Sequence, residues 1–467
     1  MMDKAAVNVE PPVPVQAPST IATAPGALPL LGHLVQFLRN PLGFVTSLPR
    51  YGDLVRIRLG TFQVIVVCDP ALTRHVLLSD RIFDKGGPLF DRLREGIGYG
   101  LGTCPHSEHR RQRRLLQPAF HPSRLGSYAQ VMTTQFADLS NSWRDNQILN
   151  VPAAIETKTA RIIVETMFAD ALPASVLDQA IDDANALFAS FYQRMLMPPP
   201  LDRLPTPGNR RYHQVRARLR HTMGSIIASR RQCSIDRGDL LSALLVARDP
   251  DPASDRQGLS DAEIYEQVVA FFIAGSESTA SILAWSLHLL ARHPDIERRL
   301  HAEVDAVLNG GVAVYEHLPK LTLTSRIITE TLRLYPPGWL LTRSTSGDTH
   351  LGRHPIPAGT TIAYSAYLIH HRPDLYPDPE RFDPDRWDST HRPPPPHDAF
   401  IPFAAGPRKC IGEHFGTIAA TLGLATIAAR WKLRSLPGPS VRTITGATLR
   451  PQGLQMRAVA RRKADGG

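Results

Sequence analysis

The sequence has few cysteines, no long apolar run and no clear targeting segment. Its 467 residues contain four cysteines without the paired spacing of a zinc site or a disulfide framework: Cys68, Cys104, Cys233 and Cys410. No apolar run reaches the ~18 residues that span a bilayer. Met1 to Ala24 is rich in Pro, Ala and Val but has no basic leader before an apolar segment. We therefore expect a reducing compartment, no membrane span, a cytoplasmic location and a disordered tail over residues 1–24.

Acidic residues are fewer than basic ones, since 43 Asp and Glu stand against 53 Lys and Arg, a formal charge of +10. Basic chains often bind nucleic acid. No basic run here is interleaved with aromatic residues, so that class is not favoured. Charge is densest in HRRQRR, residues 109–114. The run is either a solvated helix face or a surface that holds a cofactor's carboxylates and steers an acidic partner.

The interior lacks linkers and repeats, which predicts a single domain over residues 25–467. Asn40-Pro41 predicts a capped helix to about Tyr51, and alternation predicts a hairpin of 53–59 with 62–67. We expect a long loop over 79–105, because glycine breaks recur there. Helices are expected at 70–78, over most of 106–238 with proline interruptions at 198–200 and 205–208, at 261–292, at 320–335 and after Cys410. Short strands are expected from 338 to about 399, so the fold class is mainly α with small β sheets.

The stretch FAAGPRKCIG, residues 403–412, places one cysteine between a turn and an apolar, helix-compatible run. Free amide N–H groups and the positive end of a helix dipole favour a thiolate there. Gly406 permits a backbone twist, Phe403 can shield the sulfur and Arg408 adds a cation. A lone cysteine is otherwise most often a small buried hydrophobe. Shielding, a nearby cation and backbone donors together are what an axial thiolate of haem iron requires.

Ala274-Gly275-Ser276-Glu277-Ser278-Thr279 lies in the longest predicted helix. Glycine in a helix costs about 1 kcal/mol relative to alanine, so it needs a reason. One reason is a local packing kink. The other is a groove beside a cofactor, opened where hydroxyls bond back to the carbonyl four residues earlier.

Glu330 and Arg333 lie three residues apart on one predicted helix face. Read alone they are a surface pair worth about 0–1 kcal/mol. A second arginine, in Pro379-Glu380-Arg381-Phe382, precedes the cysteine stretch.

These motifs, in this order, resemble the cytochrome P450 family from about Pro25 onward. Phe-x-x-Gly-x-Arg-x-Cys-x-Gly is similar to its haem-ligand signature, and 274–279 is similar to its oxygen-activation motif, with Ser278 where threonine is usual. Residues 28–33, 109–125 and 192–211 further resemble actinobacterial sesquiterpene oxygenases. The resemblance implies a P450 fold with haem b between the central long helix and the helix after the cysteine.

The resemblance also implies a role for each candidate residue. Cys410 is the iron ligand, Glu277 with Ser278 or Thr279 delivers protons, and Glu330, Arg333 and Arg381 form a structural triad. Haem contacts are expected from His109, Arg113, Ala274, Gly275, Arg343, Phe403 and Arg408. Pocket residues, each otherwise plain core, are Phe90, Leu93, Phe191, Met195, Phe271, Ala274 and Leu340, and their lack of charge implies an apolar substrate.

The implied activity is a monooxygenase that uses O2 to oxidise an unactivated C–H bond of a hydrophobic molecule, expected to be a sesquiterpene of secondary metabolism. Electrons would come from NAD(P)H through a ferredoxin reductase and a ferredoxin, docked by the outward-facing Arg110 and Arg114 of a monomer. Two alternatives remain open: a haem-binding protein without turnover, and a non-redox or peroxide-driven haem-thiolate enzyme.

Overall fold

The structure is a computed structural model, and it describes residues 20–169, 175–176, 178–179, 182–183, 186–187, 204–233, 235–252, 256–390, 393, 395–396, 398–438, 440–446 and 448–461. Two predicted pocket residues, Phe191 and Met195, and the triple proline lie outside these ranges. Residues 20–24, expected to belong to the tail, are described, and Ala22–Thr23 form strand β1, which pairs with β2 (Leu54–Leu59).

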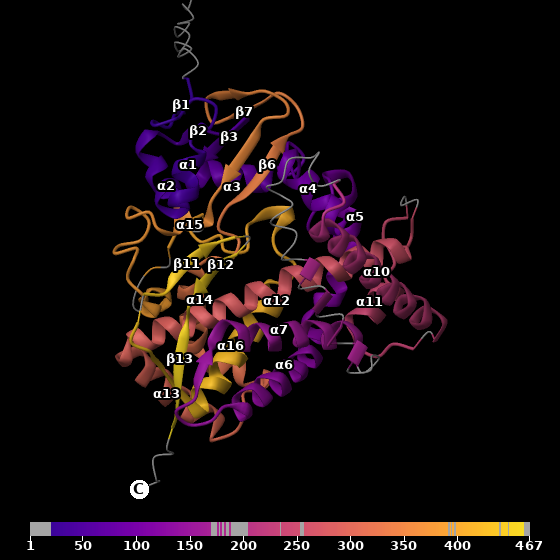
Figure 1. Ribbon diagram of the computed structural model, residues 1–467, viewed down its shortest axis with the longest axis vertical. Coiled ribbons are helices and arrows are strands. Elements are labelled where there is room, and N and C mark those ends of the chain that lie inside the picture. The colour runs from indigo at the N-terminus through magenta and orange to yellow at the C-terminus, as the bar shows by residue number, and fades with distance from the viewer. Residues whose placement is uncertain are drawn as a thin grey trace, which may run out of the picture.

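The chain is mainly helical, with small sheets, as the sequence predicts. Figure 1 shows a large helical body below and a smaller, sheet-rich part at the top. The described helices are α1 (Leu34–Arg39), α2 (Pro41–Ser47), α3 (Pro70–Leu78), α4 (Gly87–Ile97), α5 (His106–Leu116), α6 (Pro122–Ser142), α7 (Val151–Phe168), α10 (Pro207–Cys233), α11 (Leu240–Val246), α12 (Asp261–Arg292), α13 (Pro294–Leu308), α14 (Thr322–Leu334), α15 (Ala366–His370) and α16 (Glu413–Arg430).

The largest sheet has six strands in the order β1, β2, β3, β9, β6, β4. These are β1 (Ala22–Thr23), β2 (Leu54–Leu59), β3 (Phe62–Val67), β9 (Thr361–Tyr364), β6 (Leu341–Thr345) and β4 (Phe83–Asp84). A second sheet joins β10 (Trp431–Ser435), β13 (Gln455–Ala460) and β5 (Ile148–Asn150). Two hairpin-like pairs complete the set, β11 (Arg442–Thr445) with β12 (Leu449–Gln452) and β7 (Thr349–Leu351) with β8 (His354–Ile356).

Local sequence explains several element starts. The Asn40 side chain accepts a hydrogen bond from the Gly43 amide at 3.0 Å, so it caps α2 as predicted. The predicted hairpin forms as the antiparallel pair β2 and β3. Ser260 and Glu263 form a reciprocal capping box at the start of α12.

The long loop predicted over 79–105 is wrong in its middle, where α4 forms between Gly86 and Gly98. Glycines at both ends produced the loop-like pattern, and the 11 residues between them are too few for a strong periodic signal. Strand β4 also lies in this range. The predicted end of the longest helix is confirmed, although Pro294 also begins the next helix, α13.

Helix α12 runs through the helical body and packs against α7 and α16, which supply much of its surrounding apolar core. Among the described residues it is the one helix long and apolar enough to cross a membrane by length and composition. In its most apolar window 72% of the residues are buried in the protein, as in the core helix of a globular fold.

Candidate active site

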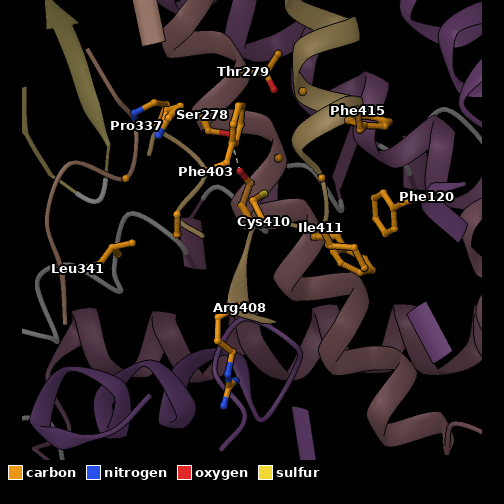
Figure 2. Close-up of a pocket in the computed structure, with 18 of the residues that line it drawn as sticks. Phe120, Ser278, Thr279, Pro337, Leu341, Phe403, Arg408, Cys410, Ile411 and Phe415 are labelled. Atoms are coloured by element: carbon orange, nitrogen blue, oxygen red, sulfur yellow. Dashed lines mark hydrogen bonds between the residues drawn. The ribbon is translucent and has the colours of Figure 1, made fainter. Parts of the chain in front are cut away.

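A cavity of about 410 Å³ lies beside the middle of α12. Its walls come from α12, α7, the start of α16, the segment before β6 and the cysteine-containing loop (Figure 2). The lining is mostly apolar and includes Phe90, Phe120, Ile163, Met167, Leu240, Phe271, Ile282, Leu341, Ile401, Phe403, Ile411 and Phe415. A cavity of this character suits an apolar ligand.

Cys410 lies in the wall of this cavity, in a loop whose backbone is fixed by glycine. Gly406 has φ +69°, and a Cβ on it would lie 2.5 Å from the Leu77 carbonyl oxygen, so only glycine fits without a shift. The Cys410 amide donates to the Phe403 carbonyl at 2.9 Å. These constraints aim the Cys410 side chain into the cavity, beside Ile411 and Phe403 in Figure 2.

The exposed part of Cys410 faces the cavity. Burial raises its pKa, and a hydrogen bond from the Gly412 amide opposes that rise. A buried thiol of this kind becomes a thiolate when it binds a metal, because the metal charge replaces the lost hydration. The loop therefore has the chemistry of an iron ligand.

Three cations also line the cavity: Lys85, Arg343 and Arg408. Arg408 is held away from the cysteine by Asp80 (Nε to Oδ2, 3.0 Å) and Asp84 (Nη2 to Oδ1, 2.6 Å), and it points away from Cys410 in Figure 2. The Arg343 guanidinium lies 5.4 Å from the Tyr364 ring centre.

Two polar atoms beside this cluster are buried without a hydrogen-bond partner in the part of the chain that the structure describes, Arg343 Nε and the Tyr364 hydroxyl. Lys85 Nζ donates to the Gly102 carbonyl at 2.7 Å. Burial and the charges of Arg343 and Arg408 lower the pKa of Lys85 to about 7. Crowded cations and unpaired polar atoms mark a place for an anionic group, such as a carboxylate.

The central helix presents its small and hydroxyl residues to the cavity. Phe271, Ala274, Gly275, Ser278 and Thr279 line it. The Ser278 hydroxyl donates to the Ala274 carbonyl at 2.7 Å, the predicted bond to the residue four positions earlier. Helix α12 nevertheless remains helical throughout.

Gly275 also has a packing reason, because a Cβ there would lie 2.6 Å from Ile163 Cδ1 on α7. The packing and groove alternatives for this glycine therefore hold together, since Gly275 also lines the cavity.

Glu277 does not line the cavity. Its Oε1 accepts from the Thr448 hydroxyl at 2.5 Å and lies 3.0 Å from Arg450 Nε, beside β12. Its Oε2 has no hydrogen-bond partner among the described residues. Burial raises the pKa of the Glu277 carboxyl, although Thr448 and Arg450 oppose that rise. The structure thus brings Ser278 and Thr279 to the cavity and leaves Glu277 behind them.

Comparisons with known proteins agree with this geometry. A family profile described as Cytochrome P450 matches residues 23–457. This chain belongs to the cytochrome P450 family. It is 43% identical over 429 residues to cyclooctat-9-en-7-ol 5-monooxygenase of Streptomyces melanosporofaciens, covering 92% of this chain and 93% of that protein.

Pentalenene oxygenase of Streptomyces avermitilis is 40% identical over 440 residues, covering 94% of this P450 and 97% of the relative. The crystal structure of the cytochrome P450DA heme domain matches with a TM-score of 0.85 at 27% identity, covering 95% of this chain and 98% of that one. The family and these relatives make the chain an oxidoreductase of the monooxygenase class, with haem iron held by a cysteine thiolate.

The residues present fit haem. Cys410 would hold the iron, the apolar walls from α12 and α16 would cover the faces of the ring, and Lys85 and Arg343 would meet its carboxylates. Lys85 had no signal in the sequence, because its place in the lining depends on a tertiary contact, the bond from its Nζ to the Gly102 carbonyl 17 residues later. The predicted haem contacts Ala274, Gly275, Arg343, Phe403, Arg408 and Cys410 all line this cavity.

His109 and Arg113, predicted for the haem carboxylates, do not line the cavity. His109 is buried, and burial with the charges of Arg408 and Lys85 lowers its pKa to about 2. Arg113 donates to the Lys409 carbonyl at 2.5 Å. Arg114, predicted to face a partner, is instead engaged by Asp249 at 2.8 and 2.9 Å. Their helix positions were predictable, but these tertiary partners were not.

The structural triad of this P450 uses a different arginine from the predicted one. Arg333 donates to both Glu330 oxygens, at 2.9 and 2.8 Å, and both side chains are fully buried. The Arg381 side chain is exposed, and only its carbonyl accepts from Arg333, at 3.1 Å. Arg386 takes the predicted place, with Nε 3.5 Å from Glu330 Oε1. Trp387 Nε1 also donates to Glu330, at 2.8 Å.

The predicted pocket residues divide. Phe90, Phe271 and Ala274 line the cavity, whereas Leu93 and Leu340 do not. Leu341 takes the place predicted for Leu340, because neighbouring residues at the start of β6 point in opposite directions. Eight further lining residues were not predicted, because no local sequence pattern separates them from ordinary core residues: Phe120, Tyr128, Ile163, Thr166, Met167, Leu240, Ile282 and Phe415.

Proposed function

We propose that this P450 hydroxylates a C–H bond of a cyclic terpene, with a sesquiterpene as the expected substrate. The observation that carries the proposal is the apolar cavity with Cys410 in its wall and no acidic side chain in its described lining. The names of relatives at 40–43% identity, which oxidise pentalenene and cyclooctat-9-en-7-ol, support the substrate class.

The proposed reaction consumes the substrate, O2, two electrons and two protons, and yields the alcohol and water. Electrons would come from NAD(P)H through a ferredoxin reductase and a ferredoxin to a cytoplasmic monomer. Haem, when bound, supplies the chemistry that activates O2. Cys410 Sγ would hold the haem iron as a thiolate ligand, and the apolar side chains exclude bulk water and orient the hydrocarbon.

Proton delivery is assigned to α12. The Ser278 hydroxyl donates its hydrogen to the Ala274 carbonyl. The hydroxyl oxygen can therefore accept a hydrogen bond from a water on the cavity side. Thr279 lines the same wall. Glu277 lies behind both, and burial raises the pKa of its carboxyl while Thr448 and Arg450 oppose that rise. Arg450 and Thr448 hold one of its oxygens and leave the other to move a proton.

The test is turnover by the purified holoenzyme with NADPH, a surrogate ferredoxin and its reductase, on a panel of cyclic terpene hydrocarbons and alcohols under 18O2. One labelled oxygen in the product is expected, with none from Cys410→Ser. Product with hydrogen peroxide alone would favour the peroxide-driven alternative. Haem binding with no product on either route would favour a haem protein without turnover.

A second arm of this test concerns the protons. Ser278→Ala, Thr279→Ala and Glu277→Gln are each expected to lower product formed per NADPH and raise peroxide, since positioned proton transfer contributes about 10²–10⁴-fold. Product per NADPH that stays at the wild-type level in all three variants would remove α12 from the relay.

A further inference from the structure

Helix α4, called the cap below, covers part of the cavity and is bounded by two glycines with positive φ. Gly87 has φ +79° and Gly98 has φ +78°, at the first residue of α4 and immediately after its last residue. Phe90, on the first turn of α4, lines the cavity. Glycines at both ends of a short element are where a hinge absorbs backbone rotation.

Each end of the cap is anchored to a different part of the fold. The chain before α4 is fixed in the six-stranded sheet, where Phe83 of β4 pairs with Thr345 of β6. The chain after α4 is fixed to α12, where the Leu101 amide donates to Gln267 Oε1 at 2.9 Å. Gly98 approaches α12 so closely that a Cβ would lie 2.5 Å from Glu266 Oε1.

One side chain on the cap joins these two anchored ends. Arg94 Nη2 donates to the Lys85 carbonyl at 2.5 Å, and its Nε donates to the Thr103 carbonyl at 3.0 Å. The two carbonyls lie nine residues before and nine after Arg94. The Arg94 side chain is only 14% exposed, so water competes weakly for these bonds.

Further contacts support the same closure. Lys85 Nζ donates to the Gly102 carbonyl at 2.7 Å, which links the two ends a second time. The Thr103 hydroxyl donates to the Gly98 carbonyl at 2.6 Å and shapes the second end. The guanidinium of Arg94 also lies 5.7 Å from the Tyr99 ring centre. The two carbonyls bonded by Arg94 lie outside α4, so these bonds fix the position of the cap. Arg94 also pairs with Asp91 within the helix, Nη1 to Oδ1 at 3.2 Å.

We propose that Arg94 is a positioning residue for the substrate: by joining the backbone at Lys85 and Thr103 it holds α4 closed and fixes the Phe90 ring in the cavity wall. Only the effect on substrate rests on the proposed function. The two Arg94 bonds to the backbone, called the latch below, govern the entry and exit of any bulky ligand of the iron, whatever the physiological substrate is.

The experiment compares Arg94→Met with Arg92→Met in the ferric holoenzyme. Arg92 lies on the same helix and pairs with Glu95 at 2.7 Å, so Arg92→Met removes an ion pair within α4 comparable to that of Arg94 with Asp91. The probe is 4-phenylimidazole, whose binding to haem iron shifts the Soret band and is followed by stopped flow. Cyanide, which is small enough to need no opening, reports on the iron site alone.

Arg94→Met is expected to raise the 4-phenylimidazole dissociation rate about tenfold, with cyanide binding unchanged and Arg92→Met like the wild type. Arg94→Lys, which can reach one carbonyl at a time, is expected to lie between. Unchanged 4-phenylimidazole rates in both Arg94 variants would overturn the proposal, as would an equal effect of Arg92→Met. If Arg94→Met does not fold, the Arg94→Lys rates decide.

Where a terpene is turned over, Arg94→Met is also expected to broaden the product distribution, because Phe90 is no longer fixed. A single unchanged product would refute the positioning role of Arg94. Absence of any turnover by the wild type would count against the proposed function, while the ligand rates would still test the latch.

Discussion

Replacement of Arg386 by methionine tests which arginine completes the cluster around Glu330. Arg386 has an 8% exposed side chain, its Nε lies 3.5 Å from Glu330 Oε1, and its guanidinium lies 5.7 Å from the Tyr376 ring centre. Methionine keeps much of the length and apolar packing but removes the charge. Arg381→Met is the matched control, since Arg381 is exposed and belongs to the motif that the sequence favoured.

The expected loss follows from what Glu330 retains. After Arg386→Met the carboxylate still accepts two bonds from Arg333, one from Trp387 Nε1 and one from the Asp383 amide, so it is not left as an unpaired buried charge. The loss is then a cation–π contact of about 0.5–2 kcal/mol, a long ion pair and a long hydrogen bond from Arg386 Nη2 to the Asp378 carbonyl at 3.4 Å. We expect about 1–2 kcal/mol in total, below the ~3–5 kcal/mol of a broken buried pair. Arg381→Met is expected to fall within about 0.5 kcal/mol.

Thermal unfolding of the holoenzymes, followed by far-UV circular dichroism at one scan rate and equal haem content, ranks the variants. Unfolding of a cofactor protein of this size is not two-state, so the order of the midpoints is the readout. We expect the wild type and Arg381→Met together at the top, Arg386→Met below them, and Arg333→Met lowest. An Arg381→Met midpoint at or below that of Arg386→Met would refute the assignment.

Two further predictions follow from charge and burial. Lys85→Met is expected to speed haem transfer from the ferric holoenzyme to apomyoglobin severalfold, because it removes one of the cations that would meet the haem carboxylates; a wild-type transfer rate would remove Lys85 from that role. Burial lowers the pKa of His288 to about 4, so between about pH 6.5 and 4 the unfolded chain binds a proton before the folded chain does. The free energy of unfolding should therefore decrease as the pH is lowered from about 6.5 to 4, by at most about 3 kcal/mol from this residue. His288→Phe should flatten the acid side of a plot of unfolding midpoint against pH, and an unchanged slope would contradict the assignment.

The features predicted correctly from the sequence are those fixed by local chemistry. Asn40 and Pro41 start α2 because a side-chain oxygen and a fixed φ act within one turn. The bounds of α12, Asp261–Arg292, follow from its cap and its long apolar pattern. Gly406 has a positive φ because the cysteine loop packs closely against the Leu77 carbonyl of α3. Only glycine fits there, so the loop can be recognised from its sequence.

The features predicted wrongly depend on partners distant in the chain. Arg381 and Arg386 both follow the same proline-rich stretch, and only the tertiary path of the chain decides which one meets Glu330. Leu340 and Leu341 differ by one position, and the register of β6 decides which faces the cavity. Helix α4 was missed because its 11 residues lie between glycines and give too short a pattern, and its position depends on Arg94 bonds to carbonyls nine residues away.

The two walls of the site are therefore held by different kinds of force. On the iron side, the backbone does the holding: the Cys410 amide bonds to Phe403, and Gly406 packs against the Leu77 carbonyl, so few substitutions are tolerated. On the substrate side, side chains do it, through Arg94 and the apolar residues of α4 and α7. A side-chain latch can change without disturbing the iron ligand. Differences in substrate between this P450 and relatives at about 40% identity should therefore arise from these side chains. Substitution of Phe90 or Met167 by another apolar residue should change the site of oxidation and leave the haem spectrum unchanged.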